Sequence, residues 1–152
     1  MMIRQRFATD LKDAIKARDS LRVSTLRLIT AAVKDRDIAA RTEDNPEGVP
    51  DAEILAILAK MIRQRQESAQ AYDDGGRPEL AQRERDEIAV VREYMPRQLT
   101  DAEVDKAVRA AIAETGAASI RDMGKVMAAL KARHTGAMDF ARAGTAIKQA
   151  FR

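Results

Sequence analysis

Apolar residues recur along nearly the whole chain at intervals of three and four, the spacing of one face of an α-helix. Ile3, Phe7 and Leu11 begin the pattern, and Val104 and Val108 continue it far downstream. No stretch shows the period-two alternation, bounded by turn residues, that a half-buried strand requires. The chain is therefore predicted to be all-α.

The composition favours helices packed on helices. Hydrophobic residues make up 45% and charged residues 34%, but aromatic residues only 3%, so aliphatic side chains and alanine must fill the core. Cysteine is absent, which excludes disulfides, thiolate metal sites and a cysteine nucleophile. No apolar run approaches the roughly 20 residues of a membrane span, and the first residues lack the apolar block of a signal peptide. We therefore expect a cytoplasmic protein without a membrane partner.

Capping residues, glycines and prolines divide the chain into helical segments. The first helix should cover residues 2–17, and Asp19-Ser20 should cap a second that ends near Ala40. Residues 42–50 indicate an exposed loop. Asp51 should cap a third helix, about 35 Å long at 1.5 Å per residue, with Leu58 and Tyr72 on its buried face. Gly75-Gly76 should end it before a fourth helix that begins near Pro78.

Pro96 cannot continue a helix, and it disfavours helical geometry in Met95. We therefore expect an N-terminal helical bundle over residues 1–96 and a small three-helix tail domain over residues 97–152. The motif Thr100-Asp101-Ala102-Glu103 has the form of a capping box. Ser119 to Asp122 forms a second such motif, and Asp139 should cap the last helix.

The net charge of +3 arises in the tail domain. Residues 1–98 carry 18 basic and 18 acidic side chains, whereas residues 99–152 carry 9 and 6, and residues 120–152 alone carry 7 and 2. This excess is a modest electrostatic footprint for an anionic partner. It is equally typical of a solvated surface with charges at helix ends.

Several motifs in a fixed order resemble those of the YqeY-like family. The motifs are Thr25-Leu26-Arg27-Leu28-Ile29, Ala31-Ala32-Val33-Lys34, Lys60-Met61-Ile62-Arg63-Gln64-Arg65, Glu67-Ser68, Gly76-Arg77-Pro78-Glu79-Leu80-Ala81, Glu84, Glu87-Ile88, Tyr94-Met95-Pro96-Arg97-Gln98-Leu99, residues 122–127 and residues 136–139. The resemblance covers nearly the whole chain. It implies an all-helical protein whose C-terminal part is similar to the tail domain of the B subunit of the glutamine-dependent tRNA amidotransferase, which helps to hold tRNA while catalysis occurs elsewhere.

One motif departs from the family pattern. Family members tend to carry Gly-Arg-Ala-Asp-Gly at the turn that reads Gly136-Ala137-Met138-Asp139-Phe140 here. If that arginine binds an anion in relatives, this chain must use another residue, such as Arg142, or do without.

Gly124-Lys125 is not the end of a phosphate-binding loop. That loop requires glycine at position 119 and serine or threonine at position 126, where this chain has Ser119 and Val126. On a helical wheel, an apolar face opposes the cations. The apolar face is Ile120, Met123, Met127 and Leu130, the opposite side holds Arg121 and Lys125, and the border holds Gly124 and Lys131. Close helix packing is an alternative explanation for Gly124.

The resulting candidates for RNA binding are Arg121, Gly124, Lys125, Lys131, Arg133 and Lys148. Arg133 and His134 can instead complement the dipole at the end of their helix. Arg27, Arg63 and Arg65 are candidates in the N-terminal domain, where ion pairs with Glu84 or Glu87 are the structural alternative. His134 has no neighbour at ligand spacing, so we expect no metal site and no cofactor. The serines have no base beside them, so we assign no catalytic residue.

The leading hypothesis is a non-catalytic accessory protein that associates with tRNA or other RNA, with no DNA partner. A helical adaptor between proteins is the alternative. An accessory role in carbon–nitrogen ligase activity with glutamine as amido donor is implied only by the family resemblance, and would require a partner subunit to supply the nucleophile and the nucleotide site.

Overall fold

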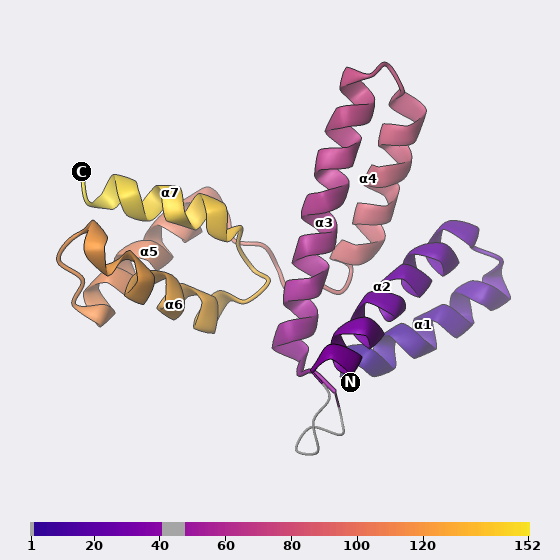
Figure 1. Cartoon of the computed structure of the whole chain (residues 1–152), viewed down its shortest axis with the longest axis horizontal. Coiled ribbons are helices and arrows are strands. Elements are labelled where there is room, and N and C mark those ends of the chain that lie inside the picture. The colour runs from indigo at the N-terminus through magenta and orange to yellow at the C-terminus, as the bar shows by residue number, and fades with distance from the viewer. Residues whose placement is uncertain (1, 41–47) are drawn as a thin grey trace. The chain divides into compact units, whose positions relative to one another are not determined.

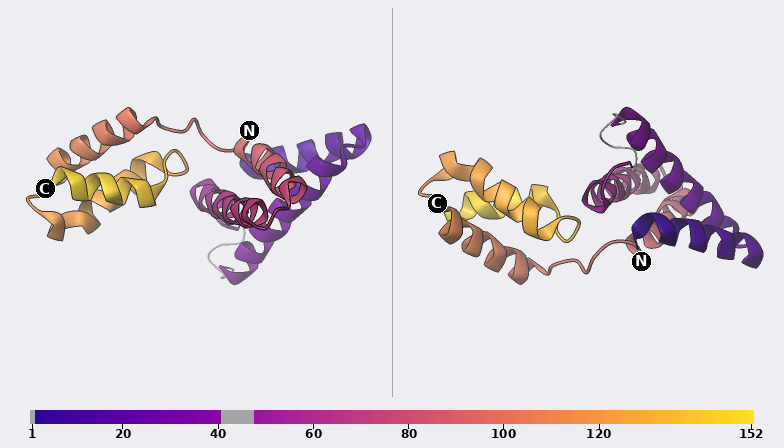
Figure 2. Two further views of the ribbon diagram at one scale, coloured as in Figure 1. Left: turned by 90° about the horizontal axis from the view of Figure 1, so that it is seen from above. Right: turned by 90° about the horizontal axis from the view of Figure 1, so that it is seen from below.

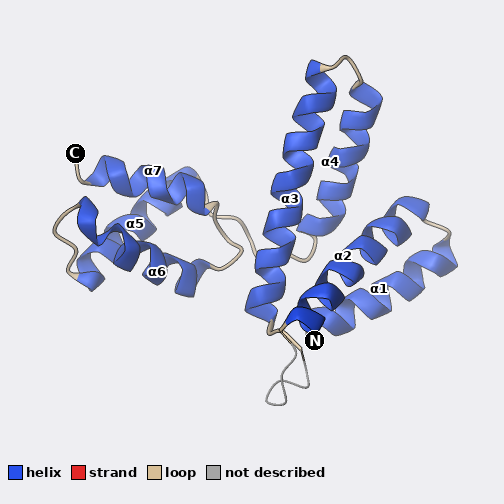
Figure 3. Cartoon of the chain, in the orientation of Figure 1, coloured by secondary structure: helices blue, strands red, loops and turns tan. Residues whose placement is uncertain are grey.

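The computed structural model describes residues 2–40 and 48–152. The chain divides into two compact units, Met1–Met95 and Pro96–Arg152. Every regular element in the described residues is helical (Figure 3). The all-α prediction is therefore confirmed.

Unit 1 consists of two helical hairpins (Figures 1 and 2). Helices α1 (Ile3–Ala17) and α2 (Ser20–Ala39) form the first, and α3 (Asp51–Asp74) and α4 (Pro78–Arg92) form the second. Helix α3 has 24 residues, which corresponds to about 36 Å. The two hairpins diverge toward their tips (Figure 1), so α2 and α4 separate from each other in that direction.

The expected helix ends are largely present in unit 1. The Asp19 carboxylate accepts a hydrogen bond from the backbone N–H of Arg22 and caps α2, and Pro78 opens α4. The expectation for Asp51 is wrong, because Pro50 occupies the cap position and makes no side-chain bond. Asp51 is instead the first helical residue, and its Oδ1 is buried without a hydrogen-bond partner among the described residues.

Aliphatic side chains from all four helices fill the core of unit 1. The members without exposed surface include Leu26, Ile29, Ile54, Leu58 and Val91. Phe7 packs edge-on against Tyr94, with ring centroids 4.8 Å apart. Tyr72, predicted to be buried, is exposed, because the tip of the α3–α4 hairpin extends beyond the other hairpin (Figure 1).

A charged clasp joins three segments beside the start of α3. The Arg4 guanidinium donates to both carboxylate oxygens of Asp37 at 2.7 Å and to the Val49 carbonyl at 2.7 Å, and the Val49 N–H donates to Asp37 Oδ1 at 2.8 Å. Residues 42–47 of the predicted loop lie outside the described residues, but Val49 is only 2% exposed. The prediction of an exposed loop is therefore wrong at Val49, because the clasp and the core hold it.

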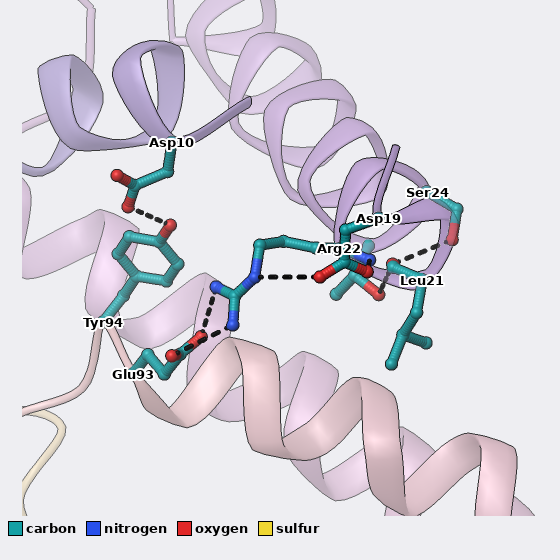
Figure 4. A network of polar contacts seen from close by, with 8 residues as sticks. Asp10, Asp19, Leu21, Arg22, Ser24, Glu93 and Tyr94 are labelled. Atoms are coloured by element: carbon teal, nitrogen blue, oxygen red, sulfur yellow. Dashed lines mark hydrogen bonds and ion pairs between the residues drawn. The ribbon is translucent and has the colours of Figure 1, made fainter. Parts of the chain in front are cut away.

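A second polar network lies at the end of α4 (Figure 4). Arg22 donates to both Glu93 oxygens, at 2.6 and 3.2 Å, and contacts Asp19 at 3.6 Å. The Tyr94 hydroxyl donates to Asp10. Burial, and then this hydrogen bond, raise the pKa of Tyr94. The network therefore ties both helices of the first hairpin to the chain that follows α4.

Unit 2 is a three-helix domain of α5 (Asp101–Thr115), α6 (Met123–His134) and α7 (Phe140–Ala150), with the short 3-10 turn η1 (Ile120–Asp122) before α6. The capping box at Thr100 and Glu103 is confirmed in both directions. Asp139 caps α7 as predicted. The core members include Val108, Val126, Leu130, Ala143 and Ile147.

The second predicted box begins the 3-10 turn instead of a long α-helix. The Ser119 hydroxyl accepts from the Arg121 N–H, and the Asp122 carboxylate accepts from the Ala118 N–H. Ile120 therefore sits in a turn outside the helical register and is exposed, which contradicts its prediction as a core residue.

Candidate functional site

Helix α6 separates an apolar side from a charged side, as its sequence predicts. Val126 and Leu130 are buried against α5 and α7, whereas Lys125 is exposed. Arg121 is also exposed but lies in η1, so its spacing from Lys125 is not that of one continuous α-helical face. These cations border the start of α6, where the backbone changes from a 3-10 turn to an α-helix.

Lys131 lies at the other end of α6, beside the start of α7. Its ammonium group is 5.8 Å from the centroid of the Phe140 ring, within the range of a weak cation–π contact. This contact packs the lysine stem against the apolar edge of unit 2 while the charge stays exposed. No ion pair involves Lys125, Lys131 or Lys148 in the part of the chain that the structure describes.

Two other basic residues of unit 2 are neutralised locally. Arg133 forms an ion pair with Glu114 of α5. Its charge is therefore neutralised by a side chain of another helix, in addition to any interaction with the dipole of its own helix. Arg142 lies 3.1 Å from Asp101. Arg142 is thus already engaged, which weakens it as a substitute for the arginine missing from the α6–α7 turn.

Gly124 is not explained by close packing. It lies in α6, and a Cβ atom placed on it would have no neighbour within 4 Å. The packing alternative is therefore wrong. The close approach between α6 and α7 occurs at Gly144, where a Cβ would be 3.2 Å from Cε of Met123 and 3.7 Å from Cε of Met127.

The altered turn between α6 and α7 has a structural role. Its Gly136 carbonyl accepts from the Gln98 side chain at 2.6 Å, and its Ala137 carbonyl accepts from the Leu99 N–H at 2.8 Å. Met138 is buried in the core of unit 2. The turn therefore anchors the segment that precedes α5, and its side chains offer no cation to a ligand.

Arg65 is the best-defined of the three arginine candidates in unit 1. Its Nε lies 3.0 Å from Glu87 Oε2, and the two side chains are 14% and 12% exposed. The ion-pair alternative is therefore confirmed for Arg65. Arg63 is exposed and forms no ion pair among the described residues, so the structure does not bring it into this pair.

Arg27 lines an open groove between the α1–α2 turn, α2 and α4, with a volume of about 740 Å³. Two further arginines line it, Arg18 and Arg83, together with the apolar side chains of Ile15, Val23 and Leu28. The sequence did not predict this groove, because Leu28 lies beside Leu26 and Ile29 of the buried face in the helical pattern, yet it is 47% exposed. The sequence feature that could have indicated the groove is the second apolar face of α2, at Val23 and Leu28 beside Arg27.

Other kinds of site have little support among the described residues. No three His, Asp or Glu side chains gather there as a metal site would require. The helices in the described ranges are too short or too polar to cross a membrane. The Ser24 hydroxyl donates to the Leu21 carbonyl at 3.0 Å (Figure 4), and Ser119 caps η1.

Comparison with known proteins gives a family match and several curated relatives. The family described as Yqey-like protein matches residues 4–151. Proteins named "Altered inheritance of mitochondria protein 41, mitochondrial" are similar in part. The Lachancea thermotolerans protein is 31% identical over 65% of this chain and 52% of its own length. The Kluyveromyces lactis protein is 32% identical over 56% and 44%, and the Eremothecium gossypii protein 33% identical over 57% and 45%.

The chain spans about half the length of the curated relatives that it matches. These relatives are named as mitochondrial proteins, which contradicts the expectation of a cytoplasmic location. That expectation rested on composition and on the absence of a signal peptide, and neither property distinguishes these compartments.

Proposed function

Because the chain belongs to the YqeY-like family, we propose that it is a non-catalytic accessory protein that associates with tRNA or another RNA through unit 2. In this proposal, unit 2 corresponds to the tail domain of the tRNA amidotransferase B subunit. The RNA-binding surface consists of Arg121, Lys125 and Lys131, with Lys148 as a further contact. The exposed cations on the outward side of η1 and α6 are the observation that carries the proposal.

The exposed cations suit phosphate binding because they remain available. Lys125 and Lys131 are exposed and form no ion pair among the described residues. Lys125 attracts the Asp122 carboxylate electrostatically, but that carboxylate is already engaged as acceptor for the Ala118 N–H. That hydrogen bond, more than the nearby Lys125, lowers the pKa of Asp122. Lys125 can therefore contact a phosphate without first breaking a side-chain hydrogen bond.

Gly124 supports the same surface. Glycine within a helix costs up to about 1 kcal/mol relative to alanine, and here no neighbour within the unit accounts for its presence. The space above it is open, so a sugar-phosphate backbone can approach the helix closely beside Lys125. Close approach and positive charge therefore coincide within one turn of α6.

Electrostatic attraction should supply most of the affinity. The two aromatic residues of unit 2, Phe140 and Phe151, are partly buried against its core, and Lys131 covers the Phe140 ring, so base stacking has little exposed ring to use. Ala137 and Phe140 replace the arginine and glycine typical of relatives, and Arg142 pairs with Asp101. In this chain, α6 rather than the α6–α7 turn should contact phosphates.

Charge reversal of the surface tests the proposal. Lys125→Glu combined with Lys131→Glu should weaken binding of unmodified tRNA at least about tenfold at moderate salt, because two phosphate contacts become repulsive. The matched control is Lys106→Glu with Arg109→Glu, which makes the same change in net charge at exposed positions of α5. Fluorescence anisotropy measures the affinity, and circular dichroism verifies that the helices persist.

A result in which both double variants lose the same affinity would attribute binding to net charge alone. Unchanged binding after reversal of Lys125 and Lys131 would contradict the proposed surface. Failure of the wild-type protein to bind tRNA and other RNA at low salt would contradict the function itself.

A further inference from the structure

The groove in unit 1 combines basic side chains with an apolar lining in which Val23 also packs against the core, whereas Ile15 and Leu28 do not belong to the core. Val23 and Leu28 of α2 and Ile15 of α1 supply its apolar lining. Ile15 is 50% exposed and Leu28 47% exposed. The residues Ser20, Val23, Ser24, Arg27 and Leu28 follow the i, i+3, i+4, i+7, i+8 pattern of one helix face. Helix α2 thus has a second face in addition to its buried face at Leu26 and Ile29.

Three guanidinium groups surround this lining. Arg18, Arg27 and Arg83 all line the groove, and Glu87 is its only acidic lining residue among those described. Glu87 is already paired, at 3.0 Å with Arg65 and at 3.8 Å with Arg83. Neither Arg18 nor Arg27 forms an ion pair within residues 2–40 and 48–152. The groove therefore carries positive charge that the rest of unit 1 does not neutralise.

Arg18 occupies a backbone conformation that disfavours an arginine. It ends α1 with φ 57° and ψ 35°, in the left-handed region, and it is the one non-glycine residue with positive φ in the described chain. Glycine is the usual residue at such a helix end. The backbone alone therefore favours glycine at position 18, whereas the groove uses the arginine side chain. An observed outlier of this kind is a reason to suspect a binding role.

We propose that this groove docks an acidic amphipathic helix of a protein partner. Its apolar residues would cover Ile15, Val23 and Leu28, and its carboxylates would contact Arg18 and Arg27. Docking of a helix into an apolar groove through residues spaced by three and four is a recurrent mode of recognition. A volume of about 740 Å³ accommodates several side chains.

The lining favours a peptide over RNA. Unlike the α6 surface, which offers mainly charge, the groove exposes aliphatic side chains, and the described lining residues include no aromatic ring on which the bases of a single strand could stack. The exposed aliphatic surface has no use in a purely phosphate-directed site. This inference is independent of RNA binding by unit 2.

The test uses the full chain and a defined probe. The probe is a fluorescein-labelled helical peptide with leucines at i, i+3, i+4 and i+7 and glutamates on its remaining faces. A peptide of identical composition in scrambled order is the control probe. We expect saturable binding of the first peptide below about 1 mM and at least about tenfold weaker binding of the scrambled one. Absence of saturable binding up to that concentration, or equal binding of both peptides, would overturn the proposal.

Matched variants then locate the site. Leu28→Gln should weaken binding roughly tenfold through loss of apolar contact. Ile38→Gln should leave it unchanged, because Ile38 is an exposed apolar residue of the same helix that does not line the groove. Equal losses in the two variants would overturn the assignment.

Arg18→Gly separates binding from folding. It should weaken the peptide severalfold by removing a cation, and at the same time raise the melting temperature by relieving the left-handed arginine. Weaker binding together with a lower melting temperature would indicate a merely structural role and overturn the assignment of Arg18. A uridine oligonucleotide that displaces the peptide from the wild type, but not from Leu28→Gln, would assign the groove to RNA and overturn the proposal.

Discussion

Among the described residues, unit 1 has four α-helices and unit 2 has three, and both have aliphatic cores, but their ion pairs differ in burial. In unit 1, ion pairs join residues far apart in sequence, such as Arg4 with Asp37 and Arg65 with Glu87. In unit 2, the ion pairs between distant residues, Arg133 with Glu114 and Arg142 with Asp101, are much more exposed to solvent, and local caps such as the box at Thr100 hold the helix starts. The comparison teaches that charged contacts between distant segments are partly buried in unit 1 and should stabilise it, whereas those of unit 2 are exposed and should contribute little, which leaves the helix caps as its clearest polar contribution.

The largest effect should come from breaking the least exposed ion pair of unit 1. Arg65→Met should lower the free energy of unfolding by about 2–3 kcal/mol, because Glu87 would lose its close partner while largely buried. Replacement of both residues, as Arg65→Met with Glu87→Leu, should recover most of that loss. Urea unfolding measures the free energy of unfolding of both variants. If the double variant does not recover the lost stability, the pair contributes more than mutual neutralisation.

Disruption of the clasp beside α3 should cost nearly as much. Gly48 has φ +87°, and a Cβ there would lie 2.6 Å from Asp37 Oδ1 and 2.8 Å from an Arg4 nitrogen. Gly48→Ala should therefore lower the free energy of unfolding by about 2 kcal/mol. Gly76→Ala is the matched control, because Gly76 has φ +73° but no atom near its Cβ position. Equal costs at the two glycines would mean that backbone strain alone, and not the clasp, sets the effect.

Loss of a cap should affect unit 2 by a smaller amount. Thr100→Ala removes the hydroxyl that accepts from the Glu103 N–H at 3.2 Å, and should cost about 1 kcal/mol. Hydrogen exchange of peptides from α5 should report the change, while peptides from α1 and α2 keep their protection. Comparable loss of protection in unit 1 would contradict the assignment of this contact to unit 2 alone.

Acid should weaken the clasp in a defined direction. The Arg4 guanidinium lowers the pKa of Asp37 from its usual 3.8 to about 2. The stabilisation is therefore complete above about pH 4 and is lost as the pH falls toward 2, with a magnitude of about 1 kcal/mol after solvent screening. Asp37→Asn should flatten this part of the pH dependence, measured by urea unfolding between pH 2 and 5. If Asp37→Asn has the same pH dependence of stability as the wild type, titration of Asp37 does not cause the loss of stability in acid.

The smallest effect has the opposite sign. Gly124→Ala should raise the stability of unit 2 by up to about 1 kcal/mol, because alanine favours the helix and its Cβ meets no neighbour. Thermal unfolding followed by circular dichroism measures this change. Destabilisation would mean that the space at Gly124 is not open.

The sequence alone predicted the helices and most of their caps, because each depends on a few neighbouring residues. Asp19, the Thr100 box and Asp139 follow from local patterns of this kind. Ile120 was misassigned because a 3-10 turn shifts the register by part of a turn.

The groove was less predictable than the helices. Leu28 fits either of two adjacent faces on a helical wheel, and only the packing of the two hairpins decides which face is covered. An ion pair between α3 and α4 could be predicted because the two helices had to form an antiparallel hairpin, but the choice of Arg65 over Arg63 and of Glu87 over Glu84 depends on how the helices pack. The availability of Lys125 and the engagement of Arg133 depend on tertiary neighbours that no local pattern specifies.

The salt dependence of tRNA binding tests the central claim most directly. For the wild type, the logarithm of the association constant should fall linearly with the logarithm of salt concentration, with a slope set by the number of phosphates neutralised. Combined Lys125→Glu and Lys131→Glu should make that slope shallower by about 2, whereas Lys106→Glu with Arg109→Glu should leave it nearly unchanged. Equal slopes for the wild type and the Lys125 and Lys131 double variant would contradict phosphate binding by α6.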